Sequence, residues 1–269
     1  MSKIESGNLT PLTPFRGAKG DIQAMQDDAL LRAKLEAMAE FAAGAGHEIN
    51  NPLAAISGRA QLLLRDETDP ERRRHLITIG AQALRIRDMI GDAMLFARPP
   101  EPQPQPVPLE DALSRVQQSL QESLGEKQLS LAGRRDPDVV LQADPTQLEI
   151  VLSELLRNAI RFAPAGSTIE VDVSRGEDDT ATMTVRDRGA GLSEIDREHL
   201  FDPFYSGRQA GRGLGFGLPK CWRIVTLHGG RIRPDESDGF AMHVEWPVAV
   251  SQADPFAVEF DNAATSTAD

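Results

Sequence analysis

The chain has little cysteine and lacks long apolar runs. Cys221 is its single cysteine, which excludes an internal disulfide and fits a reducing compartment. Apolar runs such as residues 150–156 are broken by polar residues and fall far short of the roughly 20 residues that a membrane span needs. Residues 1–20 are polar and proline-rich, without the apolar segment of a signal peptide. These absences predict a soluble, cytoplasmic protein with no membrane partner.

The chain also lacks an excess of positive charge. It has 29 Lys and Arg against 41 Asp and Glu, a formal net charge of -12. Because nucleic-acid binding needs a basic surface, we expect no nucleic-acid partner. With 269 residues, 40% of them hydrophobic, the chain is long enough for one large domain or two ordinary ones with buried cores.

Apolar residues between residues 21 and 65 recur in alternating steps of four and three, which predicts one long helix with a coiled-coil seam. Two successive steps of four, from Ala45 through Ile49 to Leu53, form a stutter, and Pro52 within it should bend the helix. A turn at residues 66–70 leads to a second helix with the same spacing. The predicted seam consists of Leu31, Leu35, Met38, Ala42, Ala45, Ile49, Leu53, Ile56, Ala60 and Leu63, then Leu76, Ile79, Ala83, Ile86, Ile90 and Ala93.

Two antiparallel helices cannot bury so long a seam alone. We therefore predict a homodimer in which two hairpins form a four-helix bundle. A helical hairpin folded onto the rest of the chain is the alternative.

Residues 99–108 contain six of the 18 prolines, which predicts an extended, semi-rigid strap between two domains. Beyond the strap the pattern becomes mixed, so the fold class is α+β. The predicted helices cover residues 109–124, 145–162 and 215–228. The predicted strands cover residues 128–131, 139–142, 168–174, 180–187, 230–233 and 240–246. The small, polar and acidic residues from 249 onward predict a disordered tail.

His47 is the first candidate for chemistry. It lies between the seam positions Ala45 and Ile49, about 200° from each around the helix, and should face outward. The carboxylate of Glu48 could accept the Nδ1 proton and thereby make Nε2 a nucleophile. Spacing alone leaves an ordinary surface histidine equally open.

Polar residues on the predicted helix 145–162 form a second candidate. Glu154, Asn158 and Arg161 share one face, because they are four and three residues apart. The Asn158 carbonyl is a suitable oxygen ligand for Mg²⁺, and Arg161 could pair with a phosphate. The alternative is the polar face of an ordinary amphipathic helix.

Two glycine motifs follow. Asp187 ends a strand and is followed by Gly189 and Gly191, so it could accept a hydrogen bond from an adenine amino group while the glycines admit the base. A simple turn is equally compatible with this motif.

The loop 211–218 opens the next helix with repeated glycines, whose N–H groups suit an anionic phosphate. It lacks the Gly-Lys-Ser/Thr of a P-loop and the strand that precedes a Rossmann loop. A flexible hinge is the alternative. Residues 201–205 between the motifs are expected to anchor a short lid through buried aromatics.

In this order, the segments resemble the conserved boxes of the sensor histidine kinases of two-component systems. Residues 47–53 resemble the H box, 154–164 the N box, 187–191 the first glycine box, 201–205 the F box and 211–218 the second glycine box. The paired Asn50 and Asn51 look most like the nitrogen-regulation type of soluble kinase. The resemblance covers about residues 22–248.

The resemblance implies a division of the chain into segments with distinct roles. A dimerisation and histidine phosphotransfer hairpin would cover residues 22–98, and a proline-rich linker residues 99–108. An ATP-binding α/β sandwich of the gyrase and Hsp90 type would cover residues 109–248, with tails at 1–21 and 249–269. The short N-terminal tail predicts that no sensor domain or membrane anchor precedes the hairpin, so that a signal arrives through this tail or a separate sensory protein.

The resemblance also assigns roles. His47 would attack the γ-phosphate of Mg-ATP with Glu48 as its base, and the phosphoryl group would pass to an aspartate in the receiver domain of a response regulator. Asn51 would position water for dephosphorylating that regulator. Asn158 would hold Mg²⁺, and Asp187 would read adenine. The remaining expected nucleotide contacts are Glu154, Arg161, Gly189, Gly191, Arg208, Gly211, Gly213, Leu214 and Gly215.

Two other functions stay open. Glu154 stands where the gyrase and Hsp90 type of ATPase has a Glu that activates water, so ATP hydrolysis without phosphotransfer is one alternative. A dimer that binds nucleotide and sequesters a regulator without catalysis is the other.

Overall fold

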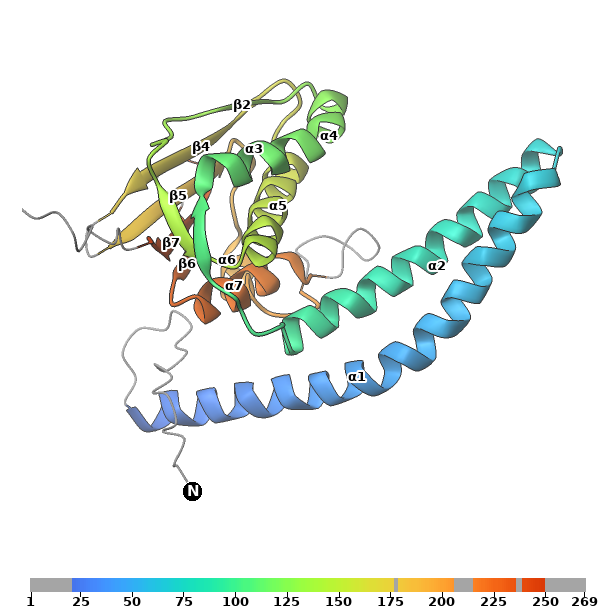
Figure 1. Ribbon diagram of the computed structural model, residues 1–269, viewed down its shortest axis with the longest axis horizontal. Coiled ribbons are helices and arrows are strands. Elements are labelled where there is room, and N and C mark those ends of the chain that lie inside the picture. Colours follow the sequence, from blue (N-terminus) through green and yellow to red (C-terminus); the bar gives the residue numbers. More distant parts are fainter. Residues whose placement is uncertain (1–20, 177–178, 206–214, 236–238, 250–269) are drawn as a thin grey trace, which may run out of the picture.

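The computed structural model describes residues 21–176, 179–205, 215–235 and 239–249 (Figure 1). A long helical hairpin projects as an arm from an α/β domain. Helix α1 (Asp21–Asp66) curves along its length and contains Pro52, as predicted. In the described part of the chain, no helix combines the length and apolar character needed to cross a membrane.

The turn between the two long helices is fixed by local capping. Helix α2 (Pro70–Ala97) begins with a proline at its first position, where the missing N–H costs nothing. Asp69 caps the helix, because its Oδ1 accepts hydrogen bonds from the N–H groups of Glu71 and Arg72 at 2.8 and 3.0 Å. The chain therefore reverses sharply, and α2 packs antiparallel on α1.

The hairpin buries only part of its apolar seam. Leu53, Ala60 and Ala83 are buried between the helices, whereas Ile56, Leu63, Ile79 and Ile86 remain 41–62% exposed. At about 100° per residue, Ile56 and Leu63 lie about 60–80° to one side of Leu53, and Ile79 and Ile86 about 40–60° from Ala83 in the same sense. Because the helices are antiparallel, this places all four residues on one face of the hairpin, called the open face below.

The α/β domain is built on a mixed five-stranded sheet in the order β2-β4-β5-β7-β6. Strands β2 and β4 are parallel, and the other neighbours are antiparallel. The strands are β2 (Ser130–Ala132), β4 (Thr168–Arg175), β5 (Thr180–Asp187), β6 (Arg231–Asp235) and β7 (Phe240–Pro247). The helices are α3 (Leu109–Ser119), α4 (Gln121–Glu126), α5 (Pro145–Phe162), α6 (Glu194–Glu198) and α7 (Gly217–Leu227).

Helices α3, α5 and α7 pack with the sheet around one continuous core (Figure 1). Alternate residues of β5 point into this core, among them Ala181, Met183 and Val185. Helix α5 contributes an apolar stripe that includes Leu148, Leu152 and Leu155. The α+β prediction is confirmed: a helical hairpin precedes an α/β sandwich.

The predicted strap differs from the structure in its second half. Residues Gln105–Pro108 form strand β1, which pairs antiparallel with β3 (Val140–Ala143) in a separate two-stranded sheet. Val107 is buried there, and the neighbouring prolines are tolerated because an edge strand needs few N–H donors. Upstream, the Gln103 N–H donates to Asp144 Oδ2 at 3.1 Å. The strap is thus fastened to the α/β domain, which the proline content alone did not reveal.

The helix predicted for residues 109–124 is also divided. Leu120 has φ -102° and ψ 5°, and it separates α3 from α4. Gln128 then adopts a positive φ of 55°, which delays the start of β2 to Ser130.

Candidate functional site

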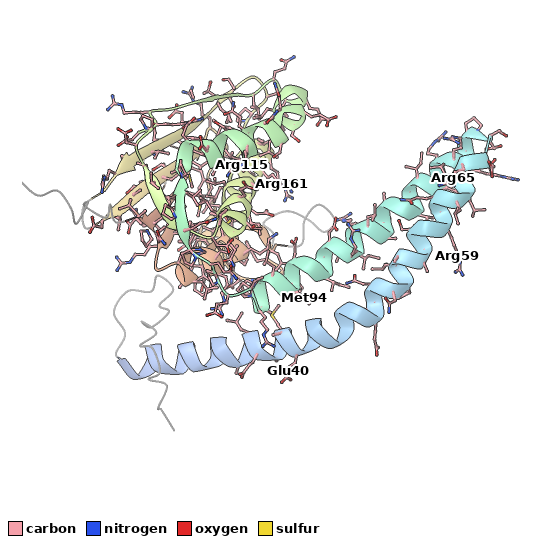
Figure 2. All side chains as sticks on the ribbon, viewed as in Figure 1. Glu40, Arg59, Arg65, Met94, Arg115 and Arg161 are labelled. Carbon is pink, nitrogen blue, oxygen red and sulfur yellow. The ribbon has the colours of Figure 1, made fainter. Side chains whose placement is uncertain are left out.

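Helix α5 presents the polar face that the sequence predicts. Its first turn is fixed by Asp144, whose Oδ1 accepts a hydrogen bond from the Gln147 N–H at 3.0 Å. Since the apolar stripe is buried in the core, Glu154, Asn158 and Arg161 remain half-buried on the opposite side. Arg161 extends from α5 on the side away from the sheet (Figure 2).

The first glycine motif adjoins the C-terminal end of α5. Asp187, 2% exposed at the end of β5, accepts a hydrogen bond from the Gly189 N–H at 2.7 Å. Burial raises the pKa of Asp187, against the opposing effects of that N–H and of the Lys127 ammonium. A Cβ at Gly189 would lie 2.6 Å from Asp187 Oδ1 and 3.0 Å from the Phe162 carbonyl oxygen. Only glycine fits this close approach, which joins the motif to α5.

Gly191 adopts a φ of +76°, in the left-handed region that favours glycine, and no atom beyond its chain neighbours would lie within 4 Å of a Cβ there. The backbone beyond Asp187 is therefore open to a ligand.

The second glycine motif lies partly outside the described residues, which exclude Gly211, Gly213 and Leu214 and also the preceding Arg208. Gly215, at its end, has a φ of +69°, and a Cβ there would overlap the backbone of Tyr205. The Tyr205 hydroxyl donates to Asp196 Oδ1 at 2.8 Å. Hydrogen bonds from Ser193 and Tyr205 lower the pKa of Asp196, so its carboxylate is a stable acceptor.

The expectation that buried aromatics anchor the lid is wrong for Phe204. This side chain is 64% exposed on a backbone with a φ of 66°, and its ring meets Phe216 edge-on at a centroid distance of 4.8 Å. The two ends of residues 206–214 are instead held together through Tyr205 and Gly215.

Glu154 connects α5 with the start of α7. A Cβ at Gly217 would lie 2.8 Å from Glu154 Oε2, and Lys220 Nζ lies 2.9 Å from Glu154 Oε1. The N-terminus of α7, where N–H groups favour an anion, is thus seated beside the polar face of α5. Sequence reasoning missed Lys220; a lysine among the apolar residues of a buried helix was the available signal.

The predicted phosphoacceptor segment lies in the middle of α1. His47 is helical, but its side chain lies outside the described part of the structure. The flanking Glu48 and Asn51 are exposed. Gly46 faces α2, since a Cβ there would lie 3.0 Å from Met94 Sδ, and Figure 2 shows Met94 directed at α1.

The same last turns of α2 meet the α/β domain. Asp92 Oδ1 lies 2.6 Å from Lys220 Nζ, and the rings of Phe96 and Phe216 are 5.9 Å apart. Phe216 also belongs to a small buried cluster with Leu35 of α1. The start of α7 is therefore docked on the hairpin next to the segment that carries His47. The alternative prediction is a hairpin folded onto the second domain. It describes only the end of the hairpin that includes the last turns of α2, because the rest of the hairpin projects away from the domain (Figure 1).

Comparison with protein families gives two matches that divide the chain in the same way. Residues 37–102 match the His Kinase A (phospho-acceptor) domain, and residues 143–250 match the histidine kinase-, DNA gyrase B- and HSP90-like ATPase. The chain carries a histidine kinase transmitter region. The phosphoacceptor match contains His47, and the ATPase match contains Glu154, Asn158 and Asp187.

Curated relatives support this assignment. The chain is 28% identical over 227 residues to the sensor histidine kinase ZraS of Klebsiella oxytoca, covering 84% of this chain and 49% of the relative. It is 32% identical to the C4-dicarboxylate transport sensor protein DctB of Pseudomonas aeruginosa, covering 80% of this chain and 36% of the relative. The chain thus spans about half or less of the length of these relatives.

Among solved structures, the transmitter region is similar to full-length ShkA, which was crystallised in complex with AMPPNP. The TM-score is 0.70 at 25% identity, covering 79% of this chain and 46% of ShkA. The ATPase match, together with this nucleotide-bound relative, supports nucleotide binding by the α/β domain.

Proposed function

We propose that this chain phosphorylates itself on His47 with ATP and passes the phosphoryl group to an aspartate of a response regulator. The observation that carries this proposal is the docking of the start of α7, beside Asp92 and Phe96, on the part of the hairpin that packs against Gly46. Candidate phosphate-binding backbone and candidate phosphoacceptor thereby belong to one region of the molecule, and the short connection between α2 and β1 would keep a domain that leaves this contact close to the hairpin.

The nucleotide would lie along the polar face of α5. Asp187 would accept a hydrogen bond from the adenine amino group, and Gly189 and Gly191 would admit the base. Arg161 and the N-terminus of α7, with Gly215 before it, would bind phosphate. Arg208, Gly211, Gly213 and Leu214 would complete the phosphate side.

Magnesium would be held by Asn158. Among the residues described, no three His, Cys, Asp or Glu side chains cluster as a metal site. Mg²⁺ in nucleotide sites typically takes one or two side-chain oxygens and completes its shell with phosphates and water, so a single half-buried amide fits this role. When bound, the ion would neutralise charge on the phosphates.

In the reaction, Nε2 of His47 would form a bond to the γ-phosphorus as the bond to the bridging oxygen breaks and ADP leaves. The Glu48 carboxylate would hold the Nδ1 proton and stabilise the developing positive charge on the imidazole. Asn51, one turn further along α1, would position water when the phosphorylated regulator is hydrolysed.

The open face of the hairpin supports a homodimer. Ile56, Leu63, Ile79 and Ile86 lie seven residues apart within each helix, the spacing of a coiled-coil seam. Covering this face with a second copy would complete a four-helix bundle. A receiver domain, and a separate sensory protein in the cytoplasm, would be the further partners.

The test is incubation of the full chain with γ-labelled ATP and Mg²⁺, followed by acid and base treatment of the protein. We expect label that survives base, is lost in acid and is absent from His47→Gln. Label that survives acid, or that persists in His47→Gln, would disprove the proposal.

Glu154 favours one other function, ATP hydrolysis of the gyrase and Hsp90 type. Its Oε1 is paired with Lys220 at 2.9 Å, so one of the two oxygens that could accept a proton from water is already occupied. We therefore expect little free phosphate in the same incubation. Rapid phosphate release with no protein label would favour the ATPase instead, and nucleotide binding with neither product would favour a scaffold.

A further inference from the structure

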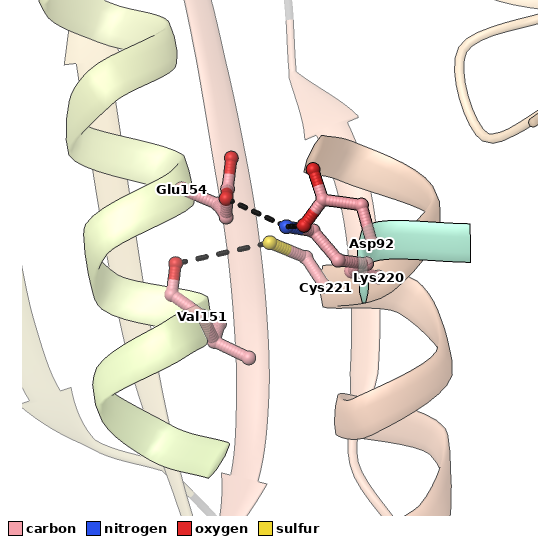
Figure 3. A network of polar contacts seen from close by, with 5 residues as sticks. All are labelled: Asp92, Val151, Glu154, Lys220 and Cys221. Atoms are coloured by element: carbon pink, nitrogen blue, oxygen red, sulfur yellow. Dashed lines mark hydrogen bonds and ion pairs between the residues drawn. The ribbon is translucent and has the colours of Figure 1, made fainter. Parts of the chain in front are cut away.

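Lys220 is a buried lysine that joins two parts of the molecule (Figure 3). Its side chain is 5% exposed, and its Nζ lies 2.6 Å from Asp92 Oδ1 of α2 and 2.9 Å from Glu154 Oε1 of α5. One carboxylate belongs to the hairpin and the other to the candidate nucleotide site. A single ammonium therefore serves two carboxylates that lie far apart in the sequence.

The geometry keeps Lys220 charged. Burial alone would lower the pKa of Lys220, but the charges of Glu154 and Asp92 and the hydrogen bonds to them outweigh burial and raise it. A buried ammonium without a partner is strongly unfavourable, so Lys220 needs a carboxylate partner while it is covered. Glu154 belongs to the same domain and stays close, whereas Asp92 is close only while the domain is docked on α2.

We propose that Asp92, Lys220 and Glu154 form an ionic latch that couples docking of the α/β domain on the hairpin to nucleotide binding beside Glu154. With the domain docked, the latch carries one net negative charge next to the start of α7. With the domain released, Lys220 pairs with Glu154 alone and the group is neutral. The anionic nucleotide binds more favourably beside the neutral group, so it should promote release, and docking should oppose nucleotide binding to the same extent.

The apolar part of the docked contact is separate from the latch. Phe96, 2% exposed, packs against Phe216, which in turn meets Phe204. Because these contacts carry no charge, they remain in place when the charge of Asp92 is removed.

The test compares Asp92→Asn with Asp88→Asn in the full chain. Asp88 lies one turn earlier on α2, is 66% exposed and pairs with Arg87 of the same helix, so its substitution removes the same charge without touching α7. Asp92→Glu, which keeps a carboxylate, is the rescue variant.

Docking is read from hydrogen exchange of two amides at the contact, those of Lys220 and Arg98, which donate to the carbonyls of Phe216 and Met94. In Asp92→Asn we expect exchange at these amides to be about tenfold faster, the effect of losing one charged hydrogen bond. Affinity for AMPPNP with Mg²⁺, measured by calorimetry, should become about fivefold tighter, the lower end of usual coupling between sites. Asp88→Asn and Asp92→Glu should match the unmodified protein.

Unchanged exchange in Asp92→Asn, unchanged affinity, or equal effects in Asp88→Asn would each overturn the latch. The inference rests on the proposed function in placing the nucleotide beside Glu154. If the unmodified chain binds no AMPPNP, the proposed function fails and the coupling fails with it. If it binds AMPPNP and labels His47 while Asp92→Asn behaves normally, only the latch is refuted.

Discussion

The hairpin and the α/β domain bury their apolar residues to different degrees. The domain has a continuous core in which residues such as Val151, Ile169 and Ile224 are fully buried. The hairpin instead leaves Ile79 and Ile86 exposed on its open face. The domain therefore has a complete core within one chain, whereas the hairpin leaves an apolar face uncovered.

The two parts also differ in the geometry that supports function. In the domain, the site depends on close backbone approaches, such as Gly189 against the end of α5 and Gly215 against Tyr205. In the hairpin, Glu48 and Asn51 stand exposed on a regular helix. A nucleotide site needs a shaped pocket, whereas a phosphoacceptor side chain must be accessible to the bound nucleotide.

The largest effect should come from charging the open face. In the double variant Ile79→Glu/Ile86→Glu, dimerisation would bury unpaired carboxylates, which costs about 3 kcal/mol or more and raises the dimer dissociation constant at least about 100-fold. Analytical ultracentrifugation should show a monomer that still binds nucleotide. Ile77→Glu is the control, because Ile77 is 55% exposed but lies off this face. An unchanged dimer dissociation constant in the double variant would show that a second copy of the chain does not cover the open face.

A smaller effect is expected at Gly215 in the domain. Gly215→Ala combines a positive φ with overlap against the Tyr205 backbone and should lower the free energy of unfolding by about 2–3 kcal/mol. Gly191→Ala shares the positive φ but meets open space, so it should lose only about 1 kcal/mol. Urea denaturation measures both, and equal losses would mean that the close approach to Tyr205 does not matter.

Acid should weaken the domain through His228. This side chain lies against Trp246 and accepts the Asp144 N–H at Nε2, and burial lowers its pKa below 6.5. Because the unfolded chain takes up a proton more readily, this contribution to stability is complete above pH 6.5 and is lost as the pH falls through 6.5 toward the folded pKa. The unfolding free energy of the domain should therefore drop between pH 7.5 and 5.5.

His228→Phe should reduce that drop, leaving a smaller part from His243, whose pKa burial also lowers. An unchanged pH dependence in His228→Phe would show that its ring takes up protons equally in the folded and unfolded chains.

The smallest effect belongs to Phe204. Since its side chain is 64% exposed, Phe204→Ala should cost no more than about 1 kcal/mol in thermal or urea unfolding. A loss of about 3–5 kcal/mol in the free energy of unfolding, as for a buried phenylalanine, would mean that Phe204 is covered in solution.

Periodicity and turn chemistry predicted much of this fold. The seam spacing predicted both long helices, and Asp69 with Pro70 marked the turn between them. The alternation around β5 gave its bounds, Thr180–Asp187, as the structure has them. Such features are local, because each depends on residues that are neighbours along the chain.

Features that depend on distant residues were missed. Pairing of β1 with β3 requires the partner strand near residue 140, which proline content does not indicate. Lys220 acquires its role only because folding brings Asp92 and Glu154 to it. The motifs around Glu154, Asp187 and Gly215 could be recognised along the sequence, but their convergence at α5 could not.

The most direct test measures protein labelling and nucleotide affinity together in His47→Gln and Asn158→Ala. It asks whether the phosphoacceptor and the nucleotide site are separate parts of the chain. We predict that His47→Gln binds Mg-AMPPNP like the unmodified chain but takes no label. Asn158→Ala should take no label because it binds Mg-AMPPNP poorly, while both variants remain folded dimers. Label from γ-labelled ATP in His47→Gln, or normal labelling in Asn158→Ala, would contradict the account.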